Sequence, residues 1–80
     1  MFVYSNSAGV MIYGEPEQLT DIASKTPAIT HLSGTDSWGA HIKCHNVGGA
    51  LTLLLRAGYR YAHEQSINGA KGMAVWYKGV

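Results

Sequence analysis

The chain has 80 residues, which is enough for a single domain (residues 1–80) and too few for two. Hydrophobic residues make up 46% of it, a share that is typical of a globular domain and excludes intrinsic disorder. The formal net charge is +1, which by itself does not indicate a nucleic-acid binder.

The cysteine content and the apolar runs indicate the cellular compartment. Cys44 is the single cysteine, so the chain forms no internal disulfide, whereas small secreted domains usually contain several. Residues 1–6 lack the basic and apolar regions of a signal peptide. Apolar runs such as residues 53–55 are far shorter than a membrane span. The sequence therefore predicts a cytoplasmic protein with no membrane partner.

The first part of the chain predicts a hairpin followed by a helix. Residues 2–4 and 10–13 are rich in β-branched and aromatic side chains, and turn-forming residues separate them. Residues 15–25 follow as a helix. Pro16 suits its first turn, and Pro27 ends it because the residue before a proline avoids helical geometry.

The middle of the chain predicts one strand. Residues 28–32 fit either a short strand or a packed loop, and residues 33–37 are predicted to be a loop. Residues 38–45 alternate as a half-buried strand does. One predicted face holds Trp38, Ala40, Ile42 and Cys44, and the other holds Gly39, His41, Lys43 and His45.

The last part predicts a second helix and a second hairpin. Residues 47–57 have a wide apolar helical face, with Asn46 as the N-cap and Gly58 just beyond the end. Residues 59–65 and 73–78 alternate as strands, and the loop between them holds an Asn–Gly turn signal.

These elements predict an α+β fold with the order β-β-α-β-α-β-β. An antiparallel sheet of about five strands with two helices on one face buries one side of every element. The opposite face of the sheet is then partly open, and its edge strands make a homodimer possible.

The segment from His41 to His45 holds the densest group of reactive side chains. On a helix the two histidines would lie one turn apart, but on the predicted strand they lie about 13 Å apart and cannot share a metal ion. Cys44 points to the opposite face of that strand. No metal site and no cofactor is therefore predicted.

Charge is distributed unevenly along the chain. Residues 1–40 hold one lysine against four carboxylates, and residues 41–80 hold five basic residues against one carboxylate. The second half also holds three of the four histidines. The residue types of a metal-free ribonuclease are therefore present, although no spacing brings a base, an acid and a cation together.

The last predicted hairpin offers a candidate binding surface. Arg60, Trp76 and Lys78 combine aromatic and basic chemistry that stacks on bases and pairs with phosphates. The same residue types dominate hot spots of protein interfaces, and Trp76 alternatively belongs to the core. The partner-surface candidates are Arg60, Trp76, Lys78, His41, Lys43 and His45.

The function predicted from these observations is binding rather than catalysis. A small chain without a cofactor motif, a catalytic set or a strong charge most often binds a macromolecule. We expect a non-catalytic protein that binds and inhibits a host protein or complex, plausibly a phage or mobile-element anti-defence factor of the anti-CRISPR kind. The alternatives are a small nucleic-acid-binding protein, acting through the basic second half, and a metal-free ribonuclease toxin.

Overall fold

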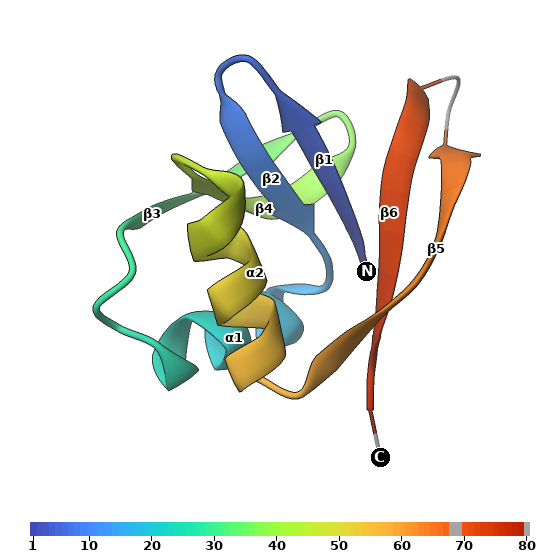
Figure 1. Ribbon diagram of the computed structural model, residues 1–80. Coiled ribbons are helices and arrows are strands. Elements are labelled where there is room, and N and C mark those ends of the chain that lie inside the picture. Colours follow the sequence, from blue (N-terminus) through green and yellow to red (C-terminus); the bar gives the residue numbers. More distant parts are fainter. Residues whose placement is uncertain (68–69, 80) are drawn as a thin grey trace.

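The computed structural model describes residues 1–67 and 70–79, which form one antiparallel sheet and two helices (Figure 1). The elements, in chain order, are β1 (Phe2–Asn6), β2 (Gly9–Tyr13), α1 (Pro16–Lys25), β3 (His31–Asp36), β4 (Gly39–Cys44), α2 (Val47–Arg56), β5 (Tyr59–Ile67) and β6 (Ala70–Lys78). The predicted Asn68–Gly69 turn lies outside the described residues. Neither described helix is long and apolar enough to cross a membrane.

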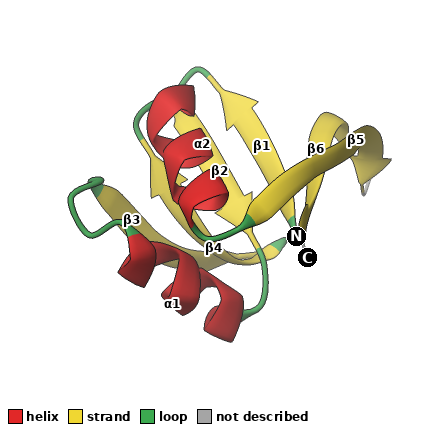
Figure 2. Cartoon of the chain, turned by 60° about the horizontal axis from the view of Figure 1, so that its bottom comes forward, coloured by secondary structure: helices red, strands yellow, loops and turns green. Residues whose placement is uncertain are grey.

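The predicted α+β architecture is confirmed, with one strand more than expected. The sheet has six strands, and both helices cover the same face of it (Figure 2). The additional strand is β3, whose last four residues were predicted to be a loop. Strand β3 is an edge strand paired with β4 alone, and most of its side chains are exposed. An edge strand of this kind carries no alternating apolar pattern.

Three hairpins build the sheet. The strand order is β3-β4-β2-β1-β6-β5, so the β1–β2 hairpin is central and the other two hairpins flank it. Strands β2 and β4 pair over four residues. Strands β1 and β6 pair at only two positions, Phe2 with Val75 and Val3 with Ala74. The β5–β6 hairpin is therefore attached to the sheet through a short ladder and diverges from β1 beyond it (Figure 1).

The main core lies between the sheet and the two helices. Strand residues alternate between the two faces of a sheet, and the buried members of one face meet the apolar sides of α1 and α2. The most deeply buried side chains of this core are Ile12, Ile22, Ile42, Cys44, Leu53 and Leu54. Most of them lie in segments whose periodicity predicted a buried position.

The ends of α2 follow the predicted chemistry. The Oδ1 atom of Asn46 accepts a hydrogen bond of 2.8 Å from the backbone N–H of Gly49, as an N-cap does. The helix ends at Arg56, and Gly58 adopts a φ of +91°, a left-handed conformation that favours glycine. This stop directs the chain into β5.

The face of the sheet opposite the helices holds a second, smaller aromatic cluster. Phe2 stacks on Tyr13 with ring centroids 5.1 Å apart, and Trp38 packs edge-on against Phe2 at 6.5 Å. The prediction that Trp38 shares a face with Ala40 and Ile42 is wrong. Trp38 lies in the turn before β4, so the alternation of the strand does not reach it.

Candidate protein-interaction surface

The structure separates the three residues predicted to form a patch on the last hairpin. Trp76 is buried in the main core, and Lys78 lies two positions further along β6, on the same face. The Nζ atom of Lys78 lies 3.7 Å from a carboxylate oxygen of Asp21 on α1. Arg60 pairs with Tyr77, whose side chain alternates with that of Trp76, so Arg60 is on the opposite face.

Two of the three candidates from the β4 segment lie on the helix-free face, and the third, His45, lines a hollow beside the start of α2. His41 and Lys43 alternate with core residues of β4 and so point away from the helices. The Nδ1 atom of His41 lies 3.5 Å from Asp36 Oδ2. His45 follows the end of β4 and is exposed. These residues therefore form no continuous surface with Trp76 and Lys78.

The histidines do not assemble into a catalytic group in the described structure. The Nδ1 atom of His31 hydrogen bonds to the carbonyl of Ile29, and the Nε2 atom of His63 hydrogen bonds to Gln65. His41 approaches Asp36 instead, so these three histidines share no partner. Among residues 1–67 and 70–79, no three potential metal ligands converge.

Cys44 is placed as a core residue rather than as a nucleophile. Its side chain is 2% exposed and packs in the main core. Burial raises the pKa of the Cys44 thiol, because desolvation disfavours the thiolate. The neutral thiol is the unreactive form, so this residue is chemically inert in the folded protein.

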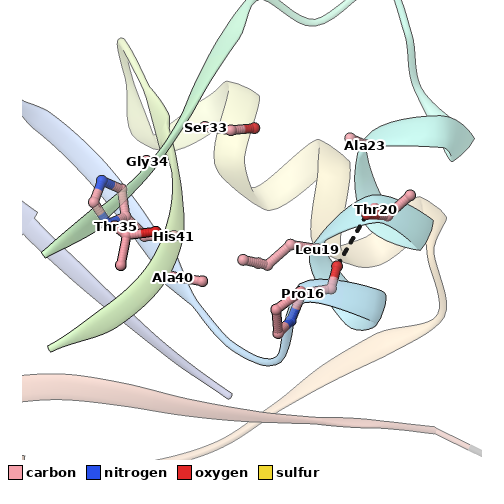
Figure 3. A pocket seen from close by; sticks show the side chains of 9 residues that line it. All are labelled: Pro16, Leu19, Thr20, Ala23, Ser33, Gly34, Thr35, Ala40 and His41. Carbon is pink, nitrogen blue, oxygen red and sulfur yellow. Dashed lines mark hydrogen bonds between the residues drawn. The ribbon is translucent and has the colours of Figure 1, made fainter.

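A hollow of about 520 Å³ between α1 and the β3–β4 hairpin is lined by His41 and by three hydroxyl residues, Thr20, Ser33 and Thr35 (Figure 3). The hydroxyl of Thr20 donates to the carbonyl of Pro16 in its own helix. Ser33 lies on the helix side of β3, whereas the ring of His41 lies on the other side of the hairpin. The hydroxyls of Thr20 and Ser33 therefore do not face the imidazole, and among the described residues no hydrogen bond joins His41 to a hydroxyl group.

The most distinctive surface is an apolar stripe along α2, which belongs to the wide apolar face that the periodicity predicted but which the structure leaves exposed. Val47, Leu51 and Leu55 follow one another at intervals of four residues, so they lie on one side of the helix. Their exposed fractions are 51%, 37% and 49%. The stripe adjoins the buried side of α2, so the apolar face of this helix is wider than the part that packs in the core. Thr52 and Arg56 lie on the remaining side, so the exposed stripe is a distinct apolar strip between the core and a polar side.

A groove continues the stripe toward the β5–β6 hairpin. Its volume is about 250 Å³. Tyr61 lines it and is 52% exposed, and Trp76 lines it as a buried residue. The other lining residues are Val3, Ser5, Val10, Val47, Ala50, Leu51, Glu64, Gly72 and Ala74. We refer to Val47, Leu51, Leu55 and Tyr61, together with this groove, as the apolar surface.

The groove exists because the β1–β6 ladder is short. Ser5 of β1 and Gly72 of β6 both line the groove. Each lies in its strand beyond the last position at which β1 and β6 pair, which is Val3 with Ala74. The register of β5 against β6 also shifts between Tyr61 and His63, as at a β-bulge. Divergence of the strands leaves space that no side chain of the sheet fills.

One buried polar atom of the apolar surface lacks a partner. The indole Nε1 of Trp76 is buried and makes no hydrogen bond. A buried N–H group without an acceptor costs about 1–3 kcal/mol relative to a satisfied one. Such groups are few in native proteins, and each one requires an explanation.

No family model, curated protein or solved structure matches this chain, so the functional argument rests on the geometry of the surface.

Proposed function

We propose that this protein is a non-catalytic interaction protein that binds a partner protein through its apolar surface. The observation that carries the proposal is the stripe of Val47, Leu51 and Leu55, an apolar part of α2 that is left open to solvent. Contiguous exposed apolar residues typically mark interaction sites in small proteins. The adjoining Tyr61 and Trp76 belong to the residue types that dominate binding hot spots.

The groove indicates the chemistry of the partner segment. An apolar side chain of the partner fills the groove beside Tyr61 and Leu51. A standard interface buries about 800 Å² on each partner. The surface area of this protein is 4801 Å², so such an interface would cover about a sixth of it.

We propose further that this binding inhibits a host protein in the cytoplasm, as phage anti-defence proteins of the anti-CRISPR kind do. Two observations support this. The candidate surface has the composition of a protein interface rather than of a catalytic cleft. The one cysteine is a buried free thiol, which suits a reducing compartment.

A nucleic-acid-binding role has less support from the geometry. Such a role needs basic side chains gathered on one face. Lys78 lies near Asp21, and Arg60 lies on the opposite face of the sheet from Trp76 and Lys78. These positions separate the aromatic and basic side chains that a shared binding surface would need.

The test is affinity capture from host lysate at low and high salt, with the wild type and two matched variants. Leu51→Glu places a charge in the centre of the apolar surface. Leu32→Glu makes the same change on β3, where the leucine is 67% exposed. We expect one protein to bind the wild type and Leu32→Glu in a fixed ratio at both salt concentrations, and to be lost with Leu51→Glu.

Two outcomes contradict the proposal. Capture that is equal for both variants shows that the apolar surface does not bind the partner. Recovery of nucleic acid alone, lost at high salt, indicates a binder of phosphate backbones instead.

A further inference from the structure

A second cavity lies on the other face of the sheet, away from both helices and from the apolar surface. Its volume is about 270 Å³. Three aromatic residues and one carboxylate contribute to its wall, which consists of Tyr4, Asn6, Met11, Tyr13, Asp36, Trp38 and Met73. Tyr4 and Met11 are paired on adjacent strands, and Trp38 reaches the cavity from the β3–β4 turn.

The aromatic rings of the cavity have different neighbours. The ring of Tyr13 packs between Phe2, at 5.1 Å, and His41, at 5.2 Å, so other rings flank it. Its hydroxyl lies 3.6 Å from the sulfur of Met11, another residue of the wall. Tyr13 therefore offers the cavity its hydroxyl end, and Tyr4 and Trp38 supply the remaining aromatic wall.

The carboxylate of Asp36 is held by the protein itself. Its Oδ1 atom accepts a 2.8 Å hydrogen bond from the backbone N–H of Trp38, and its Oδ2 atom accepts a 2.9 Å hydrogen bond from the Tyr13 hydroxyl. The Nδ1 atom of His41 lies 3.5 Å from the same Oδ2. Both oxygens therefore already have a donor.

Asp36 is negatively charged at neutral pH. Partial desolvation raises the pKa of Asp36, but the hydrogen bonds from Trp38 and Tyr13, with His41 nearby, outweigh it and lower that pKa overall. Among the described residues that line the cavity, this carboxylate carries the formal charge.

We propose that this cavity binds a methylated ammonium group, such as the trimethylammonium of choline or of a trimethylated lysine. Aromatic faces attract such cations through their quadrupole, and aromatic pockets are the known solution for recognising them. Tyr4 and Trp38 provide the aromatic wall, and Asp36 adds a fixed negative charge beside it. The two methionine side chains of the wall, Met11 and Met73, suit the methyl groups of the cation.

The bonding of Asp36 selects the type of cation. An arginine or an unmodified ammonium group binds a carboxylate by donating N–H bonds, and arginine prefers two parallel ones. Here each oxygen already accepts one hydrogen bond, from Trp38 or from Tyr13, so fewer acceptor sites of the carboxylate remain for such donors. A quaternary ammonium has no N–H to donate and needs only the charge and the rings. The cavity therefore favours the methylated cation.

The test is an NMR titration of the ¹⁵N-labelled protein with choline. We expect the Trp38 indole and backbone signals to shift in a saturable way. The neutral isostere 3,3-dimethylbutan-1-ol has the same shape without the charge, and we expect its affinity to be lower by about 2- to 30-fold, the range of a cation–π contact. Ammonium chloride is expected to leave the Trp38 signals unchanged at the same concentration.

Three variants localise the site. Asp36→Asn keeps an oxygen acceptor for the Trp38 N–H and removes the charge, so choline affinity should fall by about tenfold while the spectrum stays dispersed. Tyr4→Leu should lower it by about three- to tenfold. Tyr77→Leu removes a 57% exposed tyrosine outside the cavity and should leave the affinity unchanged.

A comparison with peptides shows whether the cation comes from a free small molecule such as choline or from a trimethylated lysine in a protein. A peptide with trimethylated lysine that binds more tightly than choline indicates a modified protein as the source, and the reverse order indicates a free small molecule. The proposal is overturned if the neutral isostere or ammonium binds as tightly as choline, or if saturating choline leaves the Trp38 signals in place.

Discussion

The ring of Tyr61 packs edge-on against the indole of Trp76, with centroids 5.9 Å apart and planes inclined at 75°. Tyr61 is half exposed and Trp76 is 6% exposed, so one ring forms the rim of the groove and the other its floor. The pair connects the core to the surface that we propose to bind a protein. A partner that covers Tyr61 would also cover the small exposed part of Trp76.

Removal of the Tyr61 ring is expected to expose the indole of Trp76. In a Trp38→Phe background, Tyr61→Ala should shift the fluorescence of Trp76 to longer wavelength and lower the free energy of unfolding by about 1 kcal/mol. Tyr77→Ala on the neighbouring strand is the control, since that tyrosine is equally exposed and does not line the groove. An unchanged emission in Tyr61→Ala would show that Tyr61 does not cover the indole.

Adjacent leucines of α2 should differ sharply in their contribution to stability. Leu54 is fully buried, so Leu54→Ala is expected to lower the free energy of unfolding by about 2–5 kcal/mol. Leu55 is 49% exposed, so Leu55→Ala should change it by about 0.5 kcal/mol or less. Urea denaturation measures both values. Similar losses for the two variants would mean that the stripe belongs to the core.

The Cys44 thiol should be protected in the folded state. Because the side chain is buried and its pKa is raised, a thiol reagent such as DTNB should react slowly with the native protein and rapidly in guanidinium chloride. The absorbance of the released thiolate follows the reaction. Rapid reaction of the native protein would contradict the placement of Cys44 in the main core.

Tyr13 should titrate above the ordinary tyrosine range. Burial, together with the hydrogen bond to Asp36 and the charge of that carboxylate, raises its pKa to about 12. The folded state therefore holds the proton more tightly than the unfolded state does. The contribution of Tyr13 to stability is complete below about pH 10 and is lost as the pH rises toward 12.

Phenolate absorbance and unfolding measurements check this titration. The wild type should show a late phenolate transition near pH 12 that Tyr13→Phe lacks. The alkaline loss of stability between pH 10 and 12 should also be smaller in that variant. A Tyr13 transition at the ordinary pKa would show that the hydroxyl is not held by Asp36.

The regular elements were predictable because their side chains follow clear periods. The helix around Leu19 and the strand containing Ile42 each have an apolar pattern that matches one buried face, whereas the apolar pattern of α2 is wider than the face that it buries. The caps at Asn46 and Gly58 fixed the limits of α2 to within one residue. Periodicity and capping residues therefore predict an element where the apolar residues of the pattern are also the residues that the fold buries.

Strand β3 was not predicted in full, because its extended conformation is stabilised by pairing with β4 and not by the composition of its own residues. Ser33, Gly34 and Thr35 have the composition of a loop, and each finds its strand geometry opposite a residue of β4. An edge strand that buries little has no apolar alternation to show. The register shift between Tyr61 and His63 was likewise not evident, since it depends on the β6 partner.

The candidate sites could be predicted only in part. Trp76 and Tyr61 were both visible as aromatic strand residues, but the groove between them and α2 depends on where the β1–β6 ladder stops. The prediction that Arg60 shares a face with Trp76 is wrong. Alternation shows which residues of one strand share a face, but it does not show which face is buried or how two strands are aligned. The contact between Tyr13 and Asp36 joins residues 23 positions apart, which no local pattern reveals.

The central claim is that the apolar surface contacts a partner protein, and site-specific photocrosslinking tests it most directly. A photoreactive p-benzoylphenylalanine is placed at position 51, in the apolar surface, or at position 32, on the exposed edge of the sheet. After irradiation in host lysate, we predict one discrete protein adduct from position 51 and none from position 32. No adduct from position 51, or the same adducts from both positions, would contradict the claim.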